Sequence, residues 1–200
     1  MLFRSGRPSG RYWRECSALP LFSSRLHRAK DAQYRDAWKK RGEVLSILAN
    51  IARKVDRVEY ALDGVAAVSG ETLVDTAVDL FVYCLKYESF LLDLDDTIDT
   101  EICYEGSIKK PYSSGTNAFE YLLLRFDLGG LEVKASVETS IHQVLLRFAD
   151  LEKCFSALEA RQPVAERFAK VQALASASAD LVGALRSEQS AAYRVFVNTP

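Results

Sequence analysis

The sequence predicts an all-α protein folded as an antiparallel helical bundle. Three segments, residues 43–62, 69–93 and 137–158, carry apolar side chains at the spacing of one helix face. Gly42 stands directly before the first of these segments, where it should break a preceding helix. The short connection over residues 63–69 makes the first two helices antiparallel neighbours.

The composition is that of a globular protein without strong overall charge. Of the 200 residues 48% are hydrophobic and 26% charged, and the net charge is -1. No basic field favours nucleic acid or an anionic membrane, and no apolar run is long enough to span a bilayer. The four cysteines form no CxxC pair and are expected to be reduced thiols, which predicts a cytoplasmic location. The two histidines exclude a histidine-rich metal site.

Changes in composition divide the chain into four parts. Residues 1–22 are predicted to be a basic flexible arm, residues 23–93 a helical core, residues 94–116 an acidic linker and residues 117–200 a C-terminal helical extension. The arginine- and serine-rich, acid-poor start also fits an organellar transit peptide.

The segment 69–93 carries a row of carboxylates opposite a broad apolar arc. Glu71, Asp75 and Asp79 are spaced by four, which places them on one helix face. Like charges at this spacing destabilise a helix by about 0.2–0.5 kcal/mol per pair. With Ser69 as the expected N-cap, only Glu71 lies near enough to the helix start to be stabilised there. Mg²⁺ would relieve the repulsion; the alternative is a solvated acidic face.

The segment 43–62 carries a basic stripe that could face those acids. Its predicted buried stripe is Val44, Ile47, Leu48, Ile51, Val55, Val58 and Leu62. Its polar side consists of Ser46, Asn50, Arg53 and Arg57, with Lys54 adjacent. We therefore predict that Arg53 and Arg57 face Asp75 and Asp79 across a cleft.

The run YRDAWKKRGEVLSILANIARKVDRVEYAL, followed by ETLVDTAVDLFVYCLKY, resembles a known enzyme family. It is similar to the phage-type, nucleotide-modification-associated subgroup of the MazG-like all-α nucleoside triphosphate pyrophosphohydrolases. The matching positions are Tyr34, Trp38, Arg41, Gly42, Arg53, Lys54, Asp56, Arg57, Glu71, Asp75, Thr76, Asp79, Leu80 and Tyr83. The resemblance implies a bundle in which acidic helices hold Mg²⁺ against the phosphates of a nucleotide.

One departure from the family concerns the metal ligands. Better-known members carry a Glu-Glu-x-x-Glu motif on the helix before the acidic one, where this chain has Asn50, Arg53, Lys54 and Arg57. Glu43 or a second subunit would have to complete the metal site.

The resemblance implies Mg²⁺-dependent release of pyrophosphate from a nucleoside triphosphate. Glu71, Asp75 and Asp79 would hold the metal, which polarises phosphoryl oxygens and lowers the pKa of an attacking water. Arg53, Lys54 and Arg57 would neutralise phosphate charge, Asn50 would also contact the nucleotide, and the base would stack on Tyr34, Trp38 or Tyr83. The alternatives are a catalytically incomplete nucleotide-sensing or assembly subunit and a scaffold.

The C-terminal half is predicted to be helical and to support assembly. Helices are expected at residues 117–126, 131–160 and 164–186. The long apolar stripe from Val137 to Leu158 predicts a homo-oligomer or a hetero-complex formed through these helices.

Overall fold

The computed structural model describes residues 28, 35–63, 71–98, 111–114, 117–124, 126, 133, 135–155 and 162–198. Within these residues the chain is helical and contains no strand, which confirms the all-α prediction. The elements are η1 (Arg35–Trp38), η2 (Glu43–Leu48), α3 (Ala49–Tyr60), α4 (Leu73–Leu94), α6 (Asn117–Leu124), α7 (Val137–Glu152), η3 (Lys153–Phe155), α8 (Val164–Glu188) and α9 (Ser190–Asn198). The predicted arm at residues 1–22 and the predicted stacking residue Tyr34 lie outside the described residues.

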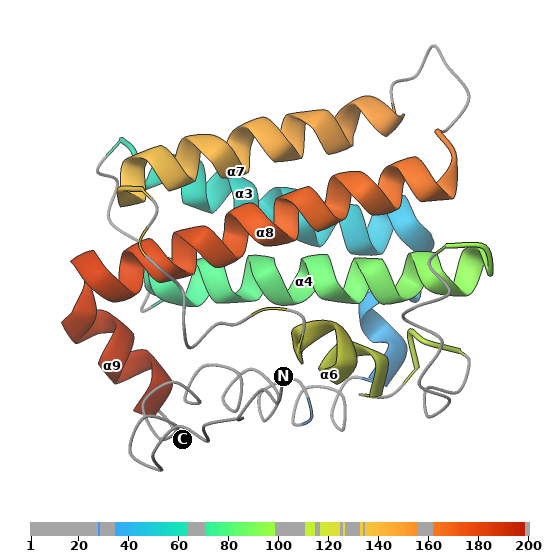
Figure 1. Ribbon diagram of the computed structural model, residues 1–200, viewed down its shortest axis with the longest axis horizontal. Coiled ribbons are helices and arrows are strands. Elements are labelled where there is room, and N and C mark those ends of the chain that lie inside the picture. Colours follow the sequence, from blue (N-terminus) through green and yellow to red (C-terminus); the bar gives the residue numbers. More distant parts are fainter. Residues whose placement is uncertain are drawn as a thin grey trace, which may run out of the picture.

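Helix α4 is the central element of the bundle. It packs against α8 and α3 on one side and against α6 on the other (Figure 1). Tyr87 and Glu88 are fully buried and Lys86 nearly so, although they lie outside the predicted apolar arc. That arc consists of Leu73, Val74, Ala77, Leu80, Phe81, Cys84, Leu85, Leu91 and Leu92. The expected division of this helix into an apolar and a polar side is therefore wrong for its C-terminal half, because helices distant in sequence cover its other faces.

Helices α3 and α4 are antiparallel, as the short connection between them predicted. Contacts between η2–α3 and α4 pair residues in opposite order along the chain. The pairs are Lys54 with Asp79, Arg57 with Glu71, and Glu43 with Tyr87. The basic and acidic stripes consequently meet along one contact between two helices.

The first turn of the α3 segment is a π-helix. Gly42 precedes it with φ of 81°, a left-handed conformation that suits glycine, and it marks the predicted break. The wider π turn changes which side chains face inward, so Glu43 is buried and Val44 is 45% exposed. Val44 and Leu62 were expected in the buried stripe and are instead exposed, whereas Ile47, Ile51, Val55 and Val58 are buried.

The apolar stripe of α7 is covered within the chain. Ile141, Val144, Phe148 and Leu151 are buried, and α7 packs along α8. His142 on the same helix is exposed. Over the described residues of α7 this stripe is packed within the chain, and its predicted end at Leu158 lies outside the described residues. The predicted oligomer or hetero-complex stays a prediction.

One hydrophobic core joins residues from both halves of the sequence. It runs from Ile47 in η2 to Phe196 in α9. Phe81 of α4 packs edge-on against Phe126, with ring centroids 5.0 Å apart. None of the described helices is long and apolar enough to cross a membrane.

Candidate functional site

Lys54 lies at the centre of the contact between the two stripes. Its Nζ is 2.7 Å from Glu71 Oε1 and 2.8 Å from Asp79 Oδ2. The Lys54 side chain is only 6% exposed, while those of Glu71 and Asp79 are 32% and 19% exposed. Two carboxylates eight positions apart in the sequence thus converge on one buried ammonium group.

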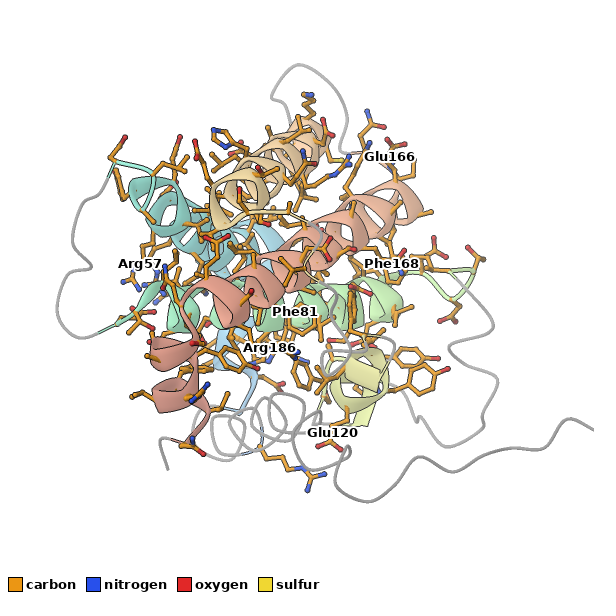
Figure 2. The ribbon with its side chains drawn as sticks, turned by 60° about the vertical axis from the view of Figure 1, so that its left-hand side comes forward. Arg57, Phe81, Glu120, Glu166, Phe168 and Arg186 are labelled. Atoms are coloured by element: carbon orange, nitrogen blue, oxygen red, sulfur yellow. The ribbon has the colours of Figure 1, made fainter. Side chains whose placement is uncertain are left out.

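The two arginines of the basic stripe have different surroundings. Arg57 Nη1 donates to Glu71 Oε2, so both oxygens of Glu71 are hydrogen-bonded to cations. Figure 2 shows Arg57 at the edge of the bundle, beside the beginning of α4. Arg53 is exposed and its Nη2 donates to Asn50 Oδ1 at 3.0 Å. The prediction that both arginines face Asp75 and Asp79 is therefore wrong. Arg57 pairs with Glu71 instead, and Arg53 hydrogen-bonds to Asn50.

Asp75 caps the helix instead of joining the other two acids. Helix α4 begins at Leu73 with Thr72 as the N-cap, so the expectation of an N-cap at Ser69 is wrong. The Asp75 carboxylate accepts from Thr72 N–H at 2.8 Å, and Asp75 N–H donates to Thr72 Oγ1 at 3.2 Å. This is a capping box, in which an acid at the third helical position is favourable. Asp75 therefore lies in the first turn of α4, where an acid is stabilised, because the helix starts later than expected.

This arrangement does not fit a Mg²⁺ site built on the row of three carboxylates. Among the described residues there is no group of three or more Asp, Glu, His or Cys side chains placed to hold a metal. Asp75 Oδ2 is engaged by the cap, and Lys54 lies between Glu71 and Asp79. Glu43 cannot complete the set from its position, because it is buried against Tyr87 and Arg167.

Aromatic and cationic groups extend the face along α4. Tyr83 is half-buried one turn after Asp79, and burial together with the Asp79 charge raises the pKa of its hydroxyl against the opposing effect of Arg53 and Lys54. Lys86 Nζ lies 5.7 Å from the centre of the Tyr83 ring and 5.4 Å from that of Trp38. The structure thus places Trp38 and Tyr83 at one end of the face, joined by a lysine.

A second lysine connects Trp38 to the segment 111–114. Lys39 Nζ lies 5.6 Å from the centre of the Trp38 ring and donates to Ser113 O and Oγ at 2.8 Å. The backbone N–H of Ser113 in turn donates to Asp93 Oδ2 at 3.1 Å. Lys39 and Lys86 were not predicted as site residues. The sequence signal that could have indicated them is that Lys39 follows Trp38 directly and Lys86 lies three positions after Tyr83.

The charges of the face lower the pKa of Glu71. Burial raises the pKa of this carboxyl, but the hydrogen bond and charge of Lys54 and the charge of Arg57 outweigh that effect, so the pKa lies below its usual value of 4.5. A carboxyl with a lower pKa in the folded state stabilises the fold above its unfolded-state pKa. That contribution is lost as the pH falls from about 4.5 through the folded-state pKa.

Asp79→Asn is expected to lower the free energy of unfolding by about 1–3 kcal/mol, because it removes one of the two carboxylates that hold the buried Lys54 ammonium. Urea denaturation at pH 7 measures the change. The matched control is Asp56→Asn on the exposed side of α3, which should stay within about 0.5 kcal/mol of the wild type. Equal or higher stability of Asp79→Asn would identify the row as a solvated acidic face.

Comparisons with protein-family models, with curated proteins and with solved structures found no match. The likeness to the MazG-like pyrophosphohydrolases rests on the residues of this chain alone. Of those residues, the structure brings Lys54, Arg57, Glu71 and Asp79 into direct contact and places Tyr83 beside them.

Proposed function

We propose that the face between α3 and α4 binds a nucleotide, as a nucleotide-sensing or assembly subunit of the all-α pyrophosphohydrolase type. The observation that carries the proposal is the Lys54 ammonium between Glu71 and Asp79, which together with Arg57 offsets the charge of these two carboxylates without a metal. A chain with this arrangement keeps the charged face of the family while lacking its set of metal ligands.

The exposed cations and aromatic rings support a nucleotide as the ligand. Arg53 reaches solvent beside the Lys54 cluster, and its guanidinium suits bidentate contact with phosphate. Three cations, Arg53, Lys54 and Arg57, stand against the three carboxylates Glu71, Asp75 and Asp79, so the face has no net negative charge to repel a phosphate. Trp38 and Tyr83 are partly exposed and offer ring surface to a base.

A second candidate is Mg²⁺-dependent hydrolysis of a nucleoside triphosphate to a monophosphate and pyrophosphate. The observation that favours it is the convergence of Glu71 and Asp79, since Mg²⁺ in nucleotide sites is often held by one or two carboxylates plus substrate phosphates. This candidate requires Lys54 to leave the two acids when the nucleotide binds.

Arg53→Ala is expected to weaken nucleotide binding about tenfold, as the loss of one charge-assisted contact implies, while stability changes little because the side chain is exposed. Calorimetric titration with a panel of ribo- and deoxyribonucleoside triphosphates measures the affinity. The matched control is Arg194→Ala, an exposed arginine on α9 that should leave the affinity unchanged.

The same panel separates the two candidates when it is run with Mg²⁺, with Mn²⁺ and with EDTA. Pyrophosphate and orthophosphate are scored separately. Binding that survives EDTA without pyrophosphate release supports the sensing subunit, whereas pyrophosphate release that EDTA abolishes supports the hydrolase. Absence of binding to every nucleotide would contradict both.

A further inference from the structure

We infer that the Lys54 ammonium is the resident cation of the α3–α4 face and excludes a divalent cation from Glu71 and Asp79. The inference rests on the proposed binding function and adds that the face takes its ligand without a metal of its own. Lys54 Nζ lies within 2.8 Å of both carboxylates, at the position that a cation bridging them would occupy.

The position of Lys54 is fixed by burial as well as by charge. The residue is 5% exposed, on a turn of α3 that also buries Val55 and Ile51. Its stem is packed while its ammonium reaches the partly exposed acids, as is common for a lysine at the margin of a core. A divalent cation would have to displace this group or share its position against like-charge repulsion.

The remaining oxygens nearby are also engaged. Glu71 Oε2 accepts from Arg57, and Asp75 Oδ2 accepts from the N–H of Thr72. Mg²⁺ and Mn²⁺ prefer oxygen ligands in a compact shell, at about 2.0–2.1 Å for Mg²⁺. Binding between Glu71 and Asp79 would therefore break existing hydrogen bonds to Lys54 and bring two cations together.

Removal of the ammonium charge should reverse this exclusion. Lys54→Met keeps a long flexible stem and leaves two carboxylates facing each other without their shared cation. The variant is expected to bind Mn²⁺ at least about tenfold more tightly than the wild type, because the carboxylates can then ligate the metal. Lys54→Arg keeps the charge and should show no gain.

The test is a titration with Mn²⁺ alone, followed by the electron paramagnetic resonance signal of the free ion. Wild type and Lys54→Arg should give no saturable binding that depends on Asp79, and Lys54→Met should give saturable binding. The double variant Lys54→Met/Asp79→Asn should return to the wild-type result. Mn²⁺ should also raise the melting temperature of Lys54→Met and not that of the wild type, because a ligand stabilises the state that binds it.

The inference can fail independently of nucleotide binding, because no nucleotide is present in the titration. Saturable Mn²⁺ binding to the wild type that Asp79→Asn abolishes would overturn it, as would a folded Lys54→Met that gains no binding. Should Lys54→Met not fold, Lys54→Gln, which also removes the charge and keeps a polar end, is titrated in its place and should gain the same binding. Failure of the whole nucleotide panel, with the expected Mn²⁺ results, would remove the proposed function and leave Lys54 as the resident cation.

Discussion

Arg167→Met is expected to lower the free energy of unfolding by about 3–5 kcal/mol, because it leaves the buried Glu43 carboxylate without its guanidinium partner. Arg167 and Glu43 are 4% and 5% exposed, and Arg167 Nη1 donates to Glu43 Oε1. Arg167 Nε also donates to Gln162 O at 3.1 Å. The pair joins the beginning of α8 to the π turn η2. Urea denaturation of the wild type and the variant measures the change in the free energy of unfolding.

The hydroxyl of Tyr87 belongs to the same cluster. It donates to Glu43 Oε1, and burial together with this carboxylate raises its pKa well above the usual value of 10.0. The double variant Glu43→Gln/Arg167→Met removes both charges and leaves an amide oxygen that can accept from Tyr87. We expect it to lose less stability than the sum of the single variants, since neither charge is left buried alone.

A matched control for this prediction is Arg194→Met, an exposed arginine on α9. It should change the free energy of unfolding by no more than about 0.5 kcal/mol. A loss below about 1 kcal/mol for Arg167→Met would show that the buried pair does not hold η2 against α8.

A chain ending at residue 116 is expected to show no cooperative unfolding transition. This truncation removes α6, α8 and α9, which pack against α4, and α7, which packs against α8 and α3. Leu85 and Leu91 are fully buried in the common core and would lose neighbours contributed by these helices. The remaining η2, α3 and α4 offer too small a core for a stable domain. Circular dichroism during thermal and urea unfolding measures the outcome.

The matched test in the complete chain is Leu181→Ala on α8. This side chain is fully buried, and its truncation should cost about 2–5 kcal/mol while leaving a folded protein. If the 1–116 chain unfolds cooperatively and binds nucleotide like the whole protein, residues 23–93 form an independent unit and the C-terminal half is an extension, as the sequence predicts.

The sequence by itself determined the helices, their order and the meeting of the two charged stripes. Gly42 and Pro163 mark helix boundaries, and apolar side chains at helical spacing gave most elements close to their observed positions, although the helix expected from residue 131 begins at Val137. The short connection made α3 and α4 antiparallel, and this brought Arg57 of the basic stripe and the adjacent Lys54 against Glu71 and Asp79. These features follow from the spacing of apolar and charged residues along each helix and from the length of the connection, and both can be read from the sequence.

Only the tertiary structure decided which charges pair and which side chains are buried. Helix periodicity assigns a residue to a face but does not say which distant helix covers that face, so it missed the burial of Lys86 and Glu88 on α4. The start of α4 at Leu73 turned Asp75 into a capping residue, because a cap depends on where the chain enters the helix. Lys54 lies between Glu71 and Asp79 because packing against the core fixes its stem at that depth.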